Sequence, residues 1–324
     1  MSGPQRAAAP AGAPPPAGPQ AAPIAGAAAL PTIPAKRILS PRQKDGWLGS
    51  DYTINLYRGC SHGCIYCDSR SACYGIEDFD TIRAKENALT LLEADLRRSR
   101  RTGMVLTGSM SDPYNPHEPA ARLTHGALGL LARYGFGVVA ITKSDLVLND
   151  LGLLMRLAEG PGAAVFFTIT TLDEALCSRI EPYAPPPARR LAAMRELSLA
   201  GVVCGVLLTP ILPFLEDSRE NVIGILNAAA DAGAGMAYAG GPGNFGVTQR
   251  TGQREHFHAR LDAAFPGMAA RYRAAFGGRY FCPAADARAL EDAFQETCRR
   301  RGLVSSMSGI AAAVRGMQPV QLSF

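Results

Sequence analysis

The sequence predicts an α/β protein built on a sheet of parallel strands, with helices packed outside the sheet and a helical extension at the C-terminal end. Two observations carry this prediction. Short apolar runs of strand length alternate with amphipathic helical patterns through the middle of the chain, which is typical of parallel sheets joined by crossover helices. After residue 252 this alternation gives way to helical patterns alone.

Six segments are predicted to be strands. Two of them, Val165–Thr170 and Val202–Thr209, are apolar on successive residues, as expected where both faces of a strand are covered. In such sheets ligands bind beyond the carboxyl ends of the strands. The six predicted strands are 53–57, 104–108, 137–143, 163–171, 202–209 and 235–239.

Helical patterns separate these strands and then follow them. The longest, Ile82–Arg101, carries apolar residues on one face, and the same periodicity returns at 151–158, 191–197 and 222–229. Beyond the last strand we expect further helices at 254–264, 268–276 and 286–301.

The chain divides into three parts. Residues 1–35 hold 13 Ala, 9 Pro and 4 Gly, and Arg6 is their only charge. Such a stretch cannot bury enough apolar surface to offset the entropy of ordering its backbone, so we expect a disordered tail. Residues 36–250 form the predicted α/β domain, and residues 251–324 form the predicted helical extension.

Charge and cysteine content narrow the class of protein. The net charge of +5 lies in residues 250–324, which hold 11 Arg and 6 acidic residues. This composition is compatible with nucleic-acid contact or with amphipathic helices that expose a solvated Arg face. The uncharged stretch 197–215 is interrupted by Gly and Pro, so no membrane span is expected. Eight cysteines without an export signal predict a cytoplasmic protein whose clustered thiols bind metal.

The cysteine cluster is the most informative motif. It reads Asn55-Leu-Tyr-Arg-Gly-Cys60-Ser-His-Gly-Cys64-Ile-Tyr-Cys67 and directly follows the first predicted strand. Three thiols within eight residues can wrap one inorganic site, and Gly59 and Gly63 allow the backbone turns that this needs. Soft thiolates select zinc, Cu(I) or iron–sulfur clusters.

The residues alone leave three kinds of site open. A structural zinc needs four ligands, and Cys73 or His62 is available as the fourth. A ferredoxin-type site needs a fourth cysteine in a consistent place. The third kind is a [4Fe–4S] cluster with three protein ligands and one open iron, where chemistry can occur.

The C-x3-C-x2-C spacing, with the aromatic Tyr66 before the last cysteine, resembles the radical S-adenosylmethionine (SAM) superfamily. The resemblance implies a partial (β/α)6 TIM-like barrel and a [4Fe–4S] cluster held by Cys60, Cys64 and Cys67. It also implies an enzyme that reductively cleaves SAM to a 5′-deoxyadenosyl radical, which abstracts hydrogen from an unidentified substrate. An electron donor such as flavodoxin or ferredoxin is implied as a partner.

Further motifs are similar to the branch of this superfamily that is related to spore photoproduct lyase. Besides the cysteine motif, they are Gly108-Ser-Met-Ser-Asp-Pro-Tyr114 after the second strand and Thr142-Lys143-Ser144 after the third. The resemblance implies that polar residues at these strand ends contact SAM and that Tyr66 packs beside its adenine. The implied SAM contacts are Ser109, Ser111, Asp112 and Lys143, with Thr168 and Thr170 as weaker candidates.

Lys143 has independent support. The chain contains 29 Arg and only 4 Lys, and no Lys follows position 143. A Lys at an apolar strand end in an Arg-rich chain indicates a role for a compact point charge, which Arg cannot supply.

The sequence departs from this branch at one point. Spore photoproduct lyase returns hydrogen from a Cys near the end of the second strand, whereas no Cys occurs here between Cys73 and Cys177. This departure argues against the thymine-dimer repair reaction. An alternative class is a nucleic-acid-binding or DNA-repair-like protein with a structural metal or Fe–S site. No role is assigned to Cys73, Cys177, Cys204, Cys282 or Cys298.

Overall fold

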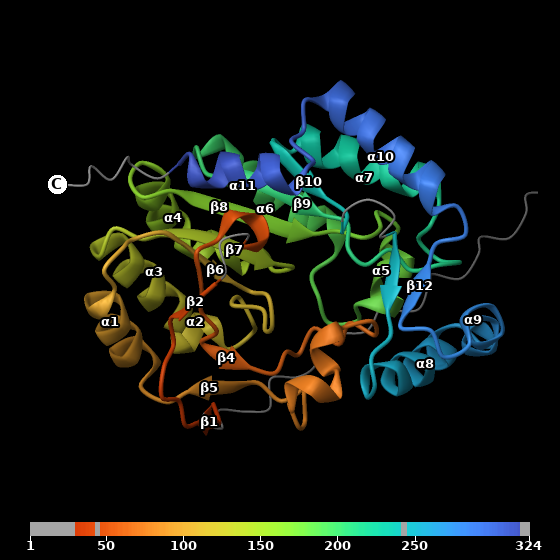
Figure 1. Cartoon of the computed structure of the whole chain (residues 1–324), viewed down its shortest axis with the longest axis horizontal. Coiled ribbons are helices and arrows are strands. Elements are labelled where there is room, and N and C mark those ends of the chain that lie inside the picture. Colours follow the sequence, from red (N-terminus) through yellow and green to blue (C-terminus); the bar gives the residue numbers. More distant parts are fainter. Residues whose placement is uncertain (1–29, 43–45, 241–244, 318–324) are drawn as a thin grey trace, which may run out of the picture.

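The computed structural model describes residues 30–42, 46–240 and 245–317. Its centre is a seven-stranded sheet whose six parallel strands follow one another in chain order (Figure 1), and β2 pairs antiparallel with β3 at one edge. The predicted parallel sheet is therefore confirmed. Its strands are β2 (Ser40–Pro41), β3 (Tyr52–Thr53), β6 (Met104–Thr107), β7 (Gly137–Thr142), β8 (Ala163–Thr168), β9 (Val203–Leu207) and β10 (Met236–Tyr238).

Both faces of the sheet are covered, which explains the continuous apolar runs of its strands. Alternate residues of β7 belong to two hydrophobic cores, an outer core between the sheet and its helices and an inner core on the opposite face. Val138 and Ala140 belong to the outer core, whereas Val139 and Ile141 belong to the inner core. Helices pack on the outer face, as the alternating pattern predicts. The helices between the strands are α1 (Ala88–Arg98), α2 (Glu118–Ala121), α3 (Leu123–Arg133), α4 (Leu151–Ala158), α5 (Glu174–Ile180), α6 (Pro187–Leu199) and α7 (Arg219–Asp231).

The inner face is covered by two segments that lie far apart in the sequence. The 3-10 helix η1 (Trp47–Gly49) packs against α11 (Met307–Arg315), and both contribute fully buried side chains to the inner core. Leu48 comes from η1, while Ile310 and Val314 come from α11. The C-terminal helix therefore belongs to the core of the sheet domain.

The first predicted strand and the first predicted helix have different bounds in the structure, because part of each belongs to a small separate sheet of β1, β5 and β4. The strand expected at 53–57 divides: its start belongs to the main sheet, and β4 (Tyr57–Arg58) pairs with β5 (Arg83–Lys85). The helix expected from residue 82 begins only at Ala88, because residues 83–85 are paired on both sides, with β4 and with β1 (Thr32–Ile33). These strands are too short to leave a periodic signal.

The C-terminal part is more than a helical extension. Its helices α8 (Gln253–Ala264), α9 (Met268–Phe276) and α10 (Ala287–Arg301) confirm the helical prediction. However, β12 (Phe281–Pro283) pairs antiparallel with β11 (Gly246–Thr248), and α10 packs along α7 (Figure 1). β12 has only three residues, too few for a strand pattern in the sequence, and it forms a strand because it pairs with β11. The end of the predicted extension, 318–324, lies outside the described residues.

The predicted tail is described only in part. Residues 1–29 lie outside the described residues, whereas 30–35 differ from the expectation because Thr32–Ile33 pairs with β5. In the part of the chain that the structure describes, no helix combines the length and the apolar character that a membrane crossing requires.

Candidate radical SAM site

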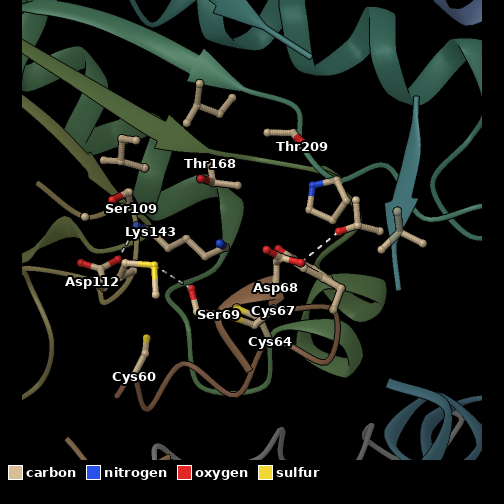
Figure 2. A pocket seen from close by; sticks show the side chains of 18 of the residues that line it. Cys60, Cys64, Cys67, Asp68, Ser69, Ser109, Asp112, Lys143, Thr168 and Thr209 are labelled. Atoms are coloured by element: carbon tan, nitrogen blue, oxygen red, sulfur yellow. Dashed lines mark hydrogen bonds between the residues drawn. The ribbon is translucent and has the colours of Figure 1, made fainter. Parts of the chain in front are cut away.

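A cavity of about 660 Å³ lies at the carboxyl ends of the parallel strands. Residues at the end of each successive strand line it: Ser109 after β6, Lys143 after β7, Thr168 in β8, Thr209 after β9 and Gly240 after β10. This is the edge at which parallel α/β sheets bind ligands. Figure 2 shows that these strand ends and the cysteine-bearing loop face the same space.

The three clustered cysteines all line this cavity. Cys60, Cys64 and Cys67 are free thiols in one loop that follows β4. Hydrogen bonds shape the loop: the Cys60 amide donates to the Phe79 carbonyl at 2.8 Å, and the Cys67 amide donates to the Cys64 carbonyl at 3.2 Å. The structure therefore brings together the three cysteines for which the sequence predicts a role as cluster ligands.

None of the other five cysteines lines the cavity. Cys73 is exposed, and its Sγ lies 3.6 Å from Nη1 of Arg250. Cys204 is buried against helix α6, with its thiol 3.6 Å from the Met194 carbonyl. Within the described residues, no group of three or more His, Cys, Asp or Glu side chains is arranged to hold a single metal ion.

Two glycines let the cysteine loop fold closely. Gly59 and Gly63 have φ of +85° and +67°, in the left-handed region that favours glycine. A Cβ at position 59 would lie 2.3 Å from the Thr81 carbonyl oxygen, and one at position 63 would lie 2.7 Å from the Tyr183 ring. The spacing of glycines in the motif thus has a steric cause.

Asp112 organises the strand ends and does not offer a free carboxylate. Its Oδ1 accepts hydrogen bonds from the Tyr114 amide at 2.9 Å and the Thr142 hydroxyl at 2.7 Å, while its Oδ2 accepts from the Lys143 amide at 2.8 Å. His62 Nδ1 lies 3.6 Å from Oδ2. Asp112 lines the cavity as predicted, but its geometry assigns it to holding the β6 and β7 loops together.

The predicted hydroxyl groups divide into two sets. Ser109, Ser111 and Thr168 line the cavity, and the buried Ser111 hydroxyl has no hydrogen-bond partner among the described residues. Thr170 does not line the cavity and lies buried beside Glu216. In a continuous strand, residues 168 and 170 would point to the same side. Because β8 ends at Thr168, this alternation does not extend to Thr170, and Thr170 does not line the cavity with Thr168.

Lys143 reaches into the cavity above the ring of Tyr66. Its Nζ lies 5.6 Å from the ring centroid and 3.8 Å from Oε1 of Glu181, to which the Tyr66 hydroxyl also donates. Burial alone would lower the pKa of Lys143, but negative charge at Cys64 and Glu181 outweighs burial and raises it. Lys143 is therefore a fixed cation.

Glu181 and Arg190 lie beside the cavity residues Tyr66, Lys143 and Thr168, and no motif in the sequence indicated them. Arg190 donates to Glu181 Oε2 at 2.5 Å, to the Thr168 carbonyl at 2.8 Å and to the Pro185 carbonyl at 2.7 Å. Burial alone would raise the pKa of Glu181, but Arg190 and Lys143 hold it at about 2. Two cations thus face one carboxylate, which leaves a positive charge at Lys143 for an anionic group.

The chain belongs to the radical SAM superfamily, whose family model matches residues 54–226. The cofactors of this family are a [4Fe–4S] cluster and SAM. The residues present fit both groups: three free thiols in the cavity supply soft ligands, and the lining also holds an unpartnered buried hydroxyl, that of Ser111, and the ammonium of Lys143.

Curated relatives share the same part of the chain. An uncharacterized protein of Mycobacterium tuberculosis is 35% identical over 229 residues, which cover 68% of this chain and 66% of that protein. An uncharacterized protein of Methanocaldococcus jannaschii is 31% identical over 195 residues, covering 59% of this chain and 71% of that protein. The chain thus spans just under two thirds of the mycobacterial relative.

Solved structures confirm the resemblance in fold to spore photoproduct lyase. The lyase complexed with a dinucleoside spore photoproduct has a TM-score of 0.59 and 18% identity, covering 82% of this chain and 80% of the lyase. A radical SAM methyltransferase from Kitasatospora setae has a TM-score of 0.50 and 10% identity, covering 79% of this chain and 54% of that enzyme. At these identities the likeness shows the fold alone.

Proposed function

We propose that the protein is a radical SAM enzyme, which reductively cleaves SAM at a [4Fe–4S] cluster and abstracts hydrogen from a substrate. The observation that carries this proposal is the convergence of three free thiols and a fixed cation on one cavity at the strand ends. We interpret the open parallel sheet as the partial (β/α)6 barrel of the superfamily.

Each cavity residue has a distinct task in this proposal. Cys60, Cys64 and Cys67 hold the cluster, and Lys143 binds the SAM carboxylate with the charge that Glu181 leaves uncompensated. Ser109, Ser111 and Thr168 offer hydroxyl groups to the polar atoms of SAM, and Tyr66 packs beside the adenine. Asp112 orients the loop that carries two of these serines and the backbone of Lys143.

When bound, a cluster held by Cys60, Cys64 and Cys67, with SAM beside it, would supply a 5′-deoxyadenosyl radical on one-electron reduction. The electron donor we propose is a small redox protein such as flavodoxin or ferredoxin, in the reducing cytoplasm that the cysteine content predicts. The substrate is a second molecule that enters the same cavity.

We do not extend this proposal to the lyase's own repair reaction. Cys204 and Cys282, which could have replaced the missing thiol near Met110, are buried and do not line the cavity. The Arg residues of the C-terminal part also serve structural contacts: Arg301 pairs with Asp231, and Arg254 donates to three backbone carbonyls. A nucleic-acid partner is the alternative, and a salt-dependent DNA shift assay tests for it.

Product analysis tests the proposal. Protein reconstituted anaerobically with iron and sulfide, then given dithionite and SAM, should yield 5′-deoxyadenosine and methionine. A protein that holds one zinc per chain, no iron and no 5′-deoxyadenosine activity contradicts it. A salt-sensitive DNA complex without SAM cleavage would support the alternative class instead.

A further inference from the structure

The first two cysteines of the loop are held by backbone contacts to the α/β domain. The Cys60 amide donates to the Phe79 carbonyl at 2.8 Å, in the segment that follows the loop. The amide of Ile65, next to Cys64, donates to the carbonyl of Ile180 at the end of α5, at 2.9 Å. These two contacts tie the first part of the loop to the domain that carries the parallel sheet.

The residues next to Cys67 are held by a different part of the chain, residues 248–253, which we call the clamp segment. Nε2 of Gln253 donates to the carbonyl of Tyr66, the residue before Cys67, at 3.1 Å. Gln253 is fully buried, and its Oε1 accepts from the Arg250 amide at 3.2 Å. Because one end of this side-chain amide must donate and the other must accept, its orientation toward the loop is fixed.

The residue after Cys67 is held by the same clamp segment. Oδ1 of Asp68 accepts from the Thr248 hydroxyl at 3.2 Å and also lies 3.2 Å from Nε of Arg250. The two neighbours of Cys67 are thus anchored to residues that lie 180 and 187 positions further along the chain. Cys67 therefore cannot shift without breaking contacts to the clamp segment.

The clamp segment packs closely against the continuation of the loop. The Ala72 amide donates to the Thr251 carbonyl at 2.9 Å. Gly252 has a φ of +83°, in the left-handed region that favours glycine, and a Cβ at this position would lie 3.2 Å from the Ala72 nitrogen. This close approach leaves the clamp segment little room to slide along the loop.

We propose that the clamp segment positions Cys67, so that Gln253 and Thr248 are positioning residues for the third cysteine of the cluster site. The consequence for the cluster rests on the proposed function, because a cluster needs all three thiols in place at once. The contacts themselves belong to the protein without a cluster. Breaking them should ease the local opening of this end of the loop, without opening its other end.

Site-resolved alkylation of the metal-free full chain tests this positioning directly. In Gln253→Leu, the Cys67 thiol should react with iodoacetamide about tenfold faster than in the wild type, because a buried hydrogen bond no longer opposes local opening. Tandem mass spectrometry locates each modified cysteine. Cys60 should keep its wild-type rate, and the buried Cys204 should stay protected, which excludes global unfolding. An equal rise at Cys60, or no rise at Cys67, overturns the proposal.

The contact between Thr248 and Asp68 provides an independent set of variants. Thr248→Val keeps the shape of the side chain and removes its hydroxyl, so Cys67 should react about threefold faster. Asp68→Ala should have a similar effect, whereas Asp68→Asn keeps an oxygen acceptor and should stay close to the wild type. A rate that rises equally in Asp68→Asn and Asp68→Ala would contradict a role for this hydrogen bond.

The matched control removes a buried hydrogen bond elsewhere in the C-terminal part. The Tyr272 hydroxyl donates to the Pro213 carbonyl at 2.8 Å, and Tyr272→Phe deletes this bond while it keeps the ring. This variant should leave the Cys67 rate unchanged. If it accelerates Cys67 as much as Gln253→Leu does, the effect is a general loss of stability and the positioning role is refuted.

The reconstituted protein separates this inference from the proposed function. Release of iron to a chelator should be about tenfold faster in Gln253→Leu than in the wild type, and unchanged in Tyr272→Phe. A wild type that takes up no cluster refutes the proposed function, while the alkylation rates still decide the positioning role. Cluster uptake with equal Cys67 alkylation in the wild type and Gln253→Leu leaves the proposed function intact and refutes the positioning role.

Discussion

The carboxylate of Glu181 joins three segments that each contribute to the cavity. It accepts from Tyr66 of the cysteine loop, faces Lys143 at the end of β7, and binds Arg190, which in turn holds the carbonyl of Thr168. Of these residues, the sequence indicated Tyr66, which lies in the cysteine motif, and Lys143 and Thr168, which lie at strand ends. Glu181 begins a proline-rich loop and Arg190 lies in a helix, so only the fold reveals that they meet.

Replacing Lys143 by Ala should weaken SAM binding and leave the iron content unchanged, because Lys143 offers a charge but no cluster ligand. We expect the SAM dissociation constant to rise by about tenfold or more, as for loss of a charged hydrogen bond. Equilibrium binding and iron analysis measure the two effects, with the exposed Lys36→Ala as the control. Equal loss of SAM and iron would assign Lys143 a structural role.

Replacing Glu181 by Gln should destabilise the fold, because the buried Arg190 would keep its charge and lose its partner. Breaking one side of a buried ion pair costs about 3–5 kcal/mol. Anaerobic urea unfolding measures this free energy, and Glu174→Gln at the exposed start of α5, the helix that ends just before Glu181, serves as the control. Equal stability of both variants would contradict the account.

Glu216 should make stability depend on pH. Burial raises its pKa to about 8, so the folded state favours the neutral acid. The stability of the wild type should therefore fall as pH rises from the unfolded pKa near 4.3 to about 8, by about 1.4 kcal/mol per pH unit. Glu216→Gln should lack this part of the decline in unfolding experiments at pH 5 and pH 8. Parallel pH profiles for the two proteins would be inconsistent with a protonated Glu216.

At the scale of elements, the long parallel strands were predictable and the short ones were not. β7 and β8 are six residues long and carry no polar side chain before their final Thr, so their sequence alone indicates strands buried on both faces. β5 and β12 have three residues each and depend on pairing with β4 and β11. Such pairing is a tertiary effect without a local periodic signal.

Helix α11 should be required for the stability of the sheet domain. Ile310 is fully buried against the inner face, so Ile310→Ala removes apolar contacts and leaves a cavity there. We expect a loss of about 2–5 kcal/mol in the free energy of unfolding. Ser308→Ala, at an exposed site in the same helix, should change little. A variant as stable as the wild type would show that α11 is a detachable appendage.

In the molecule as a whole, the residues after position 250 contact the predicted α/β domain at the cysteine loop. The Gln253 side chain donates to the Tyr66 carbonyl at 3.1 Å, and the Ala72 amide donates to the Thr251 carbonyl at 2.9 Å. The C-terminal part thus clamps the cysteine loop, while α11 fills the inner face. Hydrophobic periodicity identified these helices, but it could not show which surfaces they cover.

In the proposed enzyme, Cys60, Cys64 and Cys67 hold a cluster with one iron open to SAM. The most direct measurement is the electron paramagnetic resonance spectrum of the dithionite-reduced, reconstituted protein with and without SAM. We predict a reduced [4Fe–4S] signal that changes when SAM is added, and loss of that signal in Cys64→Ala. A protein without an iron–sulfur signal, or a signal that SAM leaves unchanged, would rule out a SAM-binding cluster at these cysteines.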